Sequence, residues 1–301
     1  MIMNKLIGLF KLFIIILILT FPVSAQQPNQ SLGQSCDPQL QKALVTRLGS
    51  IRLRNATARK QLSVVVVDIT DTTAPRMAYV NPNEMMYAAS LPKIAILLGA
   101  FEKIASGEMD LNDEIIEKLK LMIRHSSNEA ASEILHRVGI EYLAELLQSP
   151  RYRLYDPQKN GGLWVGKDYA KAPAWKRDPL HNLSHGATAL QVARFYYLLE
   201  TGQLVSPELS KLMKSILADP AHEHKFVKGL KQIQPDSEIY RKSGTWGPYH
   251  SDSAIVEHHG RRYIAVALAK SARGERWLQK LIVAVDDIIC PPDIHSRPAT
   301  N

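Results

Sequence analysis

The sequence predicts an α+β fold, in which an antiparallel sheet is flanked by helices and carries an inserted all-helical lobe. A β-branched, apolar run from Leu62 to Ile69 is typical of a strand covered on both faces. Strand patterns return after residue 238, and segments with helical spacing lie between the two regions. Strands from both ends can join one sheet only if the helical block is an insertion, which leaves a cleft at the junction.

The pattern predicts the elements in order. Strands are expected at 62–69, 76–80, 238–245, 253–257 and 261–269. Helices are expected at 93–104, 113–122, 128–138, 140–147, 188–200, 207–217 and 274–289. These assignments divide the chain into a sheet lobe formed by residues 36–80 and 220–290, a helical lobe formed by residues 81–219, and a C-terminal tail at 291–301.

The first 25 residues have the pattern of a secretory signal peptide. Lys5 and Lys11 flank the apolar run Leu12 to Leu19, and the small residue Ala25 follows it. An uncleaved membrane anchor is the alternative, although the run is short for a membrane span. Either interpretation places the body of the protein outside the cytoplasm, in the periplasm or the extracellular space, and cleavage would leave no membrane span.

An exported location affects how the cysteines and the net charge are interpreted. The chain has two cysteines, Cys36 before the first predicted helix and Cys290 at the end of the last, and an oxidising compartment favours a disulfide between them over two free thiols. The formal net charge is +8, but the basic residues are scattered. The sequence has no basic run interleaved with aromatic residues, so it does not predict a nucleic-acid partner.

A long segment, Ser149 to Gly186, lacks any sustained apolar period. It contains several glycines and prolines together with Trp and Tyr residues. A segment of this length inside a compact domain is usually functional or disordered, and its aromatic content favours an ordered flap.

Three short motifs follow one another along the chain: Ser90-Leu91-Pro92-Lys93, Ser126-Ser127-Asn128 and Lys242-Ser243-Gly244. The spacing of the first motif puts Ser90 and Lys93 on one face of a helix start. A serine hydroxyl attacks a carbonyl only with help from a base, and Lys93 can be that base if burial or nearby cations depress its pKa. The alternative for this motif alone is an N-capping serine followed by a surface lysine.

The second and third motifs can complete such a site. Ser126 can pass a proton to a leaving nitrogen, and the amide of Asn128 can hold a substrate amide. Strand alternation points Lys242 and Gly244 to the same side, where glycine permits close approach of a substrate backbone. Alone, the second motif would most simply cap the helix that follows it.

The three motifs together resemble those of the serine β-lactamase and penicillin-binding protein superfamily, and length and spacing are most similar to class A β-lactamases. The resemblance implies that Ser90 is the nucleophile, Lys93 the base and Ser126 the proton shuttle, with backbone amides of Ser90 and Thr245 forming the oxyanion hole. It also implies that Asn128, Lys242, Ser243, Gly244 and Thr245 bind substrate, with Ser243 replacing the usual threonine. No cofactor is expected, and the chain would act as a monomer on a small β-lactam or a peptidoglycan-derived peptide.

At the base for the second half-reaction, the chain departs from the class A pattern. Class A β-lactamases release the acyl group with a glutamate on the loop that edges the site, which is where the resemblance places Ser149 to Gly186. No glutamate lies between Glu145 and Glu200. Asp156 followed four residues later by Asn160 has the matching spacing but a shorter side chain. Its alternative role is to open a turn with Pro157.

Three functions therefore remain open. Fast release of the acyl group would make a β-lactamase, and slow release a D-alanyl-D-alanine carboxypeptidase or another ester or amide hydrolase. A binder of cell-wall fragments or antibiotic without turnover is the third, although such a binder needs no serine and lysine pair.

The remaining candidate groups give weaker predictions. No metal site is expected, because neither His222-Glu223-His224 nor His258-His259 has zinc-ligand spacing with a third ligand. His181 and His185, at the exit of the long segment, either line the cleft or are ordinary loop histidines. Three arginines are candidates for assisting Lys242 with a carboxylate: Arg261, Arg262 and Arg273.

Overall fold

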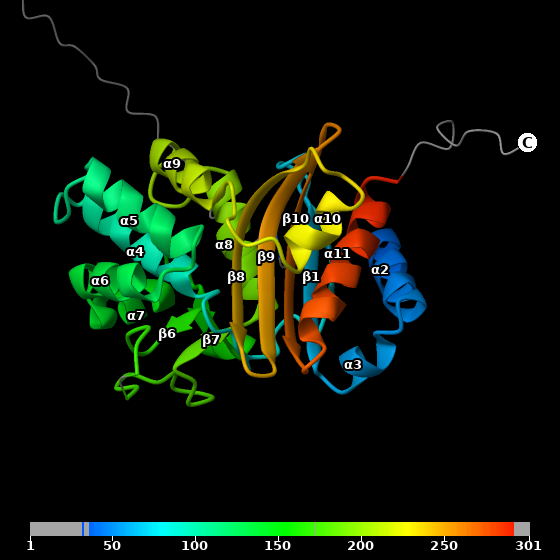
Figure 1. Ribbon diagram of the computed structural model, residues 1–301, viewed down its shortest axis with the longest axis horizontal. Coiled ribbons are helices and arrows are strands. Elements are labelled where there is room, and N and C mark those ends of the chain that lie inside the picture. Colours follow the sequence, from blue (N-terminus) through cyan, green and yellow to red (C-terminus); the bar gives the residue numbers. More distant parts are fainter. Residues whose placement is uncertain (1–31, 33–35, 172, 292–301) are drawn as a thin grey trace, which may run out of the picture.

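The protein is described by a computed structural model that covers residues 32, 36–171 and 173–291. The predicted signal peptide and residues 292–301 of the predicted tail lie outside the described residues. A five-stranded antiparallel sheet separates two groups of helices (Figure 1). Within the described part of the chain, no helix has both the length and the apolar character needed to cross a membrane.

The sheet has the order β2-β1-β10-β9-β8, so strands from both ends of the chain lie at its centre. Its strands are β1 (Leu62–Asp68), β2 (Arg76–Val80), β8 (Glu238–Trp246), β9 (Tyr249–His258) and β10 (Arg261–Lys270). The first strand pairs with the last, with Leu62 opposite Ala269. The predicted α+β class and the insertion of the helical block into an antiparallel sheet are therefore confirmed.

Two groups of helices cover the sheet. One face packs against α2 (Pro38–Ser50), α3 (Arg54–Ala58), α10 (Phe226–Lys231) and α11 (Gly274–Ile289). The other faces the helical lobe, which contains α4 (Lys93–Ala105), α5 (Asp113–Ile123), α6 (Asn128–Val138), α7 (Ile140–Gln148), α8 (Ala189–Glu200) and α9 (Pro207–Leu217). The bounds of α6, α9 and α11 agree with the sequence prediction, whereas the short α3 and α10 were not predicted.

The core lies on both sides of the sheet because β1 is buried on both faces. Val65 and Val67 belong to the apolar cluster shared with the helical lobe, and Val64 and Val66 to the cluster under α2 and α11. This alternation explains why a strand with an unbroken apolar sequence was needed at this position.

The long segment between α7 and α8 is an ordered flap, as its aromatic residues predicted. It contains β4 (Tyr155–Asp156), a 3-10 turn (Pro157–Lys159), β5 (Gly161–Gly162), β6 (Trp164–Val165) and β7 (His185–Ala187). The strand β7 lies between β6 and β3 (Met86–Tyr87), and this pairing fixes the end of the segment beside the residues that precede α4.

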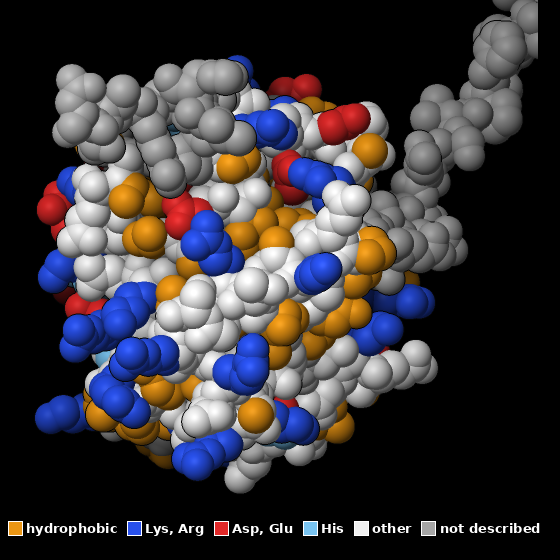
Figure 2. Space-filling model, turned by 90° about the vertical axis from the view of Figure 1, so that its right-hand side faces the viewer, with side chains coloured by type: hydrophobic (Ala, Val, Ile, Leu, Met, Phe, Trp, Pro, Cys, Tyr) orange, Lys and Arg blue, Asp and Glu red, His pale blue; other side chains and the backbone are white. Residues whose placement is uncertain are grey.

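Basic side chains are spread over the face of the molecule that carries α2 and α11. Figure 2 views the α2 and α11 side, where lysines and arginines are interspersed with apolar and uncharged polar side chains.

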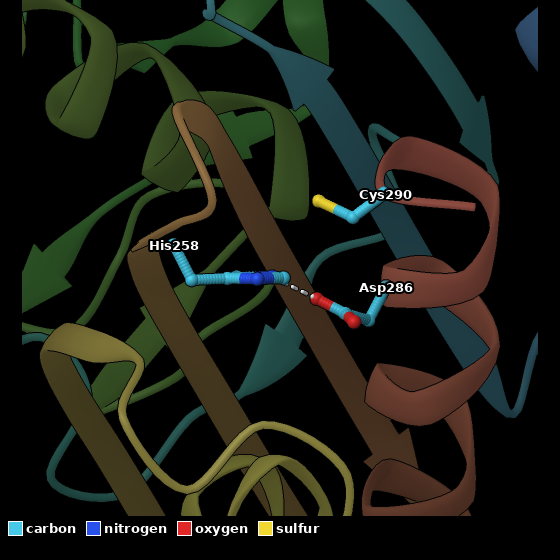
Figure 3. Close-up of side chains that lie close together, drawn as sticks. All are labelled: His258, Asp286 and Cys290. Carbon is cyan, nitrogen blue, oxygen red and sulfur yellow. Dashed lines mark hydrogen bonds and ion pairs between the residues drawn. The ribbon is translucent and has the colours of Figure 1, made fainter. Parts of the chain in front are cut away.

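The cysteine prediction needs correction, because Cys36 and Cys290 are both free thiols in this structure. Cys36 is exposed beside Met77 on β2. Cys290 caps the C-terminal end of α11 and lies near His258 and Asp286 (Figure 3), and burial together with Asp286 raises the pKa of its thiol to about 12. The predicted disulfide between them is not formed.

The cluster around Cys290 belongs to the packing of α11 on the sheet. The candidate ligand atoms of His258, Asp286 and Cys290 lie within 4.8 Å of one another. Asp286 Oδ1 already pairs with His258 Nε2 at 2.6 Å and accepts a hydrogen bond from the Tyr263 hydroxyl at 2.8 Å. These two bonds account for the buried carboxylate without any further group.

A buried ion pair joins the two strands that end at the cleft. Arg241 on β8 and Asp252 on β9 form a bidentate pair, with Nε to Oδ1 at 2.7 Å and Nη2 to Oδ2 at 2.8 Å. Their side chains are 2% and 0% exposed. Removing one partner of such a pair leaves an uncompensated charge in the interior.

We therefore expect Asp252→Asn to lower the free energy of unfolding by about 3–5 kcal/mol, as measured by urea denaturation at pH 7. Glu117→Gln is the matched control, because Glu117 pairs with Lys120 on the surface of α5 and should cost less than about 1 kcal/mol. Equal losses in the two variants would contradict the role assigned to the buried pair.

Candidate active site

Ser90 lies on the turn that leads into α4 and lines a cavity of about 370 Å³. Successive backbone hydrogen bonds, from Lys93 to Ser90 and from Ala95 to Pro92, continue this turn into the helix. Ala89, just before Ser90, has a φ of +51°, a conformation that L residues rarely adopt. Such strain is typical of functional sites where the surrounding structure holds the backbone in place.

The walls of the cavity come from four parts of the chain: the segment around Ser90, the start of α6, the flap and the end of β8. They are formed by Tyr87, Ala89, Ser90, Asn128, Lys167, Asp168, Tyr169, Ala170, Lys171, His185, Thr245 and Trp246. The cavity wall thus includes Ser90 of the first motif, Asn128 of the second, and Thr245, which directly follows the third. Lys242, Ser243 and Gly244 are not among the residues that line it.

Lys93, three residues after Ser90, is fully buried. Its Nζ donates hydrogen bonds to the backbone oxygen of Ser126 at 2.6 Å, to Asn128 Oδ1 at 2.8 Å and to the backbone oxygen of Ser127 at 3.2 Å. The ring of Tyr169 lies 4.5 Å from Nζ. Burial lowers the pKa of Lys93 from 10.5 to about 7, so a large fraction of the amine is neutral at neutral pH.

Ser126 connects the two lysines of the motifs. Lys242 Nζ donates to Ser126 Oγ at 2.9 Å, and Lys93 Nζ lies 3.5 Å from the same oxygen. Ser126 has a φ of +56°, whereas the neighbouring Ser127 caps α6 through its hydroxyl. Burial, followed by the charge of Lys93, lowers the pKa of Lys242 well below its ordinary value.

The glycine of the third motif allows β8 to approach the turn that carries Ser90. A Cβ atom on Gly244 would lie 2.3 Å from the Ala88 oxygen and 2.7 Å from the Ser90 nitrogen, so no other residue fits without displacement of backbone. This contact places the backbone of β8 next to the Ser90 amide. Ser243 faces away and does not line the cavity.

Lys225 is a buried cation that the sequence motifs did not indicate. Its Nζ donates to the Gly244 oxygen at 2.7 Å, to Thr245 Oγ1 at 2.8 Å and to the Ser251 oxygen at 3.1 Å. Burial lowers its pKa to about 8. It therefore holds the end of β8 in place, a role that sequence reasoning assigned to none of the scattered lysines.

The three arginines proposed to assist Lys242 lie elsewhere. Arg261 and Arg262 line a separate cavity together with His258, and Arg273 lines another with Trp277. The nearby arginine is Arg241, whose charge is directed at Asp252 behind the strand.

Asp156 does not line the cavity. Its carboxylate accepts a hydrogen bond from the Gln158 amide at 2.9 Å and caps the 3-10 turn, which matches the alternative role considered from the sequence. The acid that does line the cavity is Asp168, which pairs with His136 Nε2 at 2.9 Å. Spacing could not reveal Asp168, because no motif residue stands at a fixed distance from it.

The histidines singled out from the sequence differ in their position relative to the cavity. His185 lines the cavity, and His181 is bound to Asn160 outside it. His222 and His224 stack on each other, and both contact Arg241 behind β8.

The fold and the motif residues place the chain among serine β-lactamases and penicillin-binding proteins. A model of the beta-lactamase enzyme family matches residues 44–120 and 114–289. The chain belongs to this family. A search of curated proteins finds no match.

Solved structures support the fold. A β-lactamase from Xanthomonas campestris superposes with a TM-score of 0.65 at 16% identity, covering 83% of this chain and 98% of that one. A β-lactamase from Sphaerobacter thermophilus gives 0.64 at 15% identity, with coverage of 83% and 98%. A mutant of PBP-A, solved as an acyl-enzyme complex with penicillin G, gives 0.62 at 18% identity, with coverage of 82% and 94%.

The environment of Lys93 generates a direct test of its protonation state. In protein labelled with ¹³C at lysine Cε, one NMR signal should titrate with a midpoint near pH 7, because burial disfavours the charged amine. Lys93→Met should remove that signal and so assign it. A Lys93 signal that titrates near 10.5 would contradict the proposed state of the amine.

Proposed function

We propose that the protein is an exported serine hydrolase that forms an acyl-enzyme on Ser90 and hydrolyses β-lactams. The observation that carries this proposal is the arrangement around Ser126, whose hydroxyl lies between the amines of Lys93 and Lys242 beside the cavity lined by Ser90. Membership of the β-lactamase family and the fold shared with a penicillin acyl-enzyme of PBP-A support it.

In the acylation step, Ser90 Oγ attacks the lactam carbonyl carbon while its proton passes to neutral Lys93. The backbone amides of Ser90 and Thr245 stabilise the negative oxygen of the tetrahedral intermediate. The lactam C–N bond then breaks, and the leaving nitrogen takes a proton through Ser126, which Lys242 contacts. Asn128 lines the cavity with an amide nitrogen available to a substrate carbonyl, since its oxygen binds Lys93.

Lys242 also gives the site its preference for anionic substrates. β-Lactams and D-alanyl peptides both carry a carboxylate, and the buried cations Lys242 and Lys225 provide a positive potential at the end of β8. This charge supports both substrate classes equally.

A second candidate is a penicillin-binding protein of the D-alanyl-D-alanine carboxypeptidase type, with slow release of β-lactams. The observation in its favour is that Asp156 does not line the cavity, and that Asp168, which does, is bound to His136. The two functions share the acylation step and differ in the rate at which water releases the acyl group.

The test uses mature protein, a fluorescent penicillin and a chromogenic cephalosporin. We expect labelling of Ser90 and turnover of the cephalosporin, and loss of both by at least about 1,000-fold in Ser90→Ala, since the variant lacks the nucleophile. Ser50→Ala, at the exposed end of α2, is the matched control and should behave as the wild type.

Stable labelling without turnover would favour the penicillin-binding protein. Neither labelling nor turnover, in protein whose fold is verified by circular dichroism, would overturn the proposal. Labelling that persists in Ser90→Ala would assign the nucleophile to another residue.

A further inference from the structure

Release of an acyl group from a serine requires a base that takes a proton from the attacking water. Among the described residues that line the cavity, Asp168 and His185 are the side chains able to accept one at neutral pH. Asp168 lies at the outer part of the flap and is bound to His136. His185 is therefore the other candidate for this base.

His185 lines the same cavity as Ser90 and is held there by its strand. It lies on β7, the central strand of the small sheet, and its backbone oxygen accepts a hydrogen bond from the Ala88 amide at 3.0 Å, two residues before Ser90. The ring centroid lies 4.2 Å from that of Tyr169 and 6.2 Å from that of Tyr87. These two aromatic contacts hold the imidazole in position.

The imidazole of His185 is buried and incompletely satisfied. The residue is 3% exposed, its ring has a polar contact with the Lys167 backbone, and at least one ring nitrogen has no hydrogen-bond partner among the described residues. A buried ring nitrogen without a partner is costly unless a water or ligand binds there. Because His185 lines the cavity, the cavity is where such a partner can bind.

Its surroundings keep the ring neutral. Burial is the main cause that lowers the pKa of His185 to about 4, and the charges of Lys167 and Lys93 act in the same direction, while a backbone contact with Lys167 opposes them. The aromatic neighbours Tyr87 and Tyr169 carry no charge at neutral pH, because burial raises the pKa of both phenols. A neutral imidazole can accept a proton, whereas an imidazolium cannot.

We propose that His185 is the general base of deacylation in this chain, replacing the flap carboxylate of class A β-lactamases. This inference rests on the proposed function. A water bound to the free ring nitrogen attacks the acyl carbonyl carbon and transfers its proton to the imidazole. The bond from the carbonyl carbon to Ser90 Oγ then breaks, and the imidazolium gives the same proton to the serine oxygen, so that Ser90 and His185 both return to their starting states.

The experiment follows the acyl-enzyme formed with benzylpenicillin by intact-protein mass spectrometry, in wild type and in His185→Gln. We expect acylation of the variant within about three-fold of wild type and deacylation at least about 100-fold slower, because general-base catalysis is typically worth that factor or more. Acylation at the normal rate also proves that the variant is folded. His181→Gln is the matched control, since His181 lies in the same flap outside the cavity.

The outcomes separate the inference from the proposed function. A wild type that is never acylated overturns both. A wild type that is acylated and never released, or a His185→Gln variant that releases its acyl group at the wild-type rate, overturns the inference alone. Slow release in Asp168→Asn together with normal release in His185→Gln would assign the base to Asp168.

If His185→Gln does not fold, the pH dependence of acyl-group release tests the inference instead. In Asp168→Asn, deacylation of preformed acyl-enzyme should fall to half its plateau near pH 4, where the imidazole becomes protonated. A rate that stays constant through this range would overturn the inference.

Discussion

The approach of strand β8 to the turn before α4 is the contact on which the site depends. Gly244 permits it, since any side chain there would meet backbone of Ala88 and Ser90. The Ser251 hydroxyl strengthens it by donating to the Ala88 oxygen at 2.8 Å. Through this one contact the sheet lobe places Thr245 in the same cavity as Ser90 and Lys242 beside Ser126 of the helical lobe.

The close approach forces several cations into a small volume. Lys93, Lys225 and Lys242 are buried near one another, and Asp252 raises the pKa of the last two, though burial outweighs it. Desolvated amines of depressed pKa are poor contributors to stability but good acid–base groups near neutral pH. Burial of these amines therefore costs folding free energy and leaves groups that titrate closer to neutral pH.

Periodicity predicted most of the fold, because β1 and the helices α4 to α9 have strong apolar patterns that tertiary packing preserves. It missed α3, α10 and the strands β3 to β7, which are too short to show a period, and it gave no range for α2. Spacing along the chain indicated Ser90, Lys93, Ser126 and Lys242, because these residues belong to local motifs. It could not indicate Lys225 or His185, whose positions depend on packing of distant segments. The spacing of Asp156 and Asn160 suggested a base in the cavity, but Asp156 caps a 3-10 turn and does not line the cavity. The disulfide prediction failed for the same reason, because an even number of cysteines carries no information on where their side chains lie in the fold.

The pairing of β1 with β10 has a consequence for how the molecule is made. The register joins Leu62 to Ala269, so β1 stays unpaired on its β10 side until almost the whole chain is available. Contacts of such large sequence separation form slowly, and a chain that is synthesised from its N-terminus cannot complete the sheet early. The hydrolytic pocket, which needs the end of β8, therefore assembles only after synthesis is nearly finished, and a chain shortened at its C-terminal end would be inert rather than partly active.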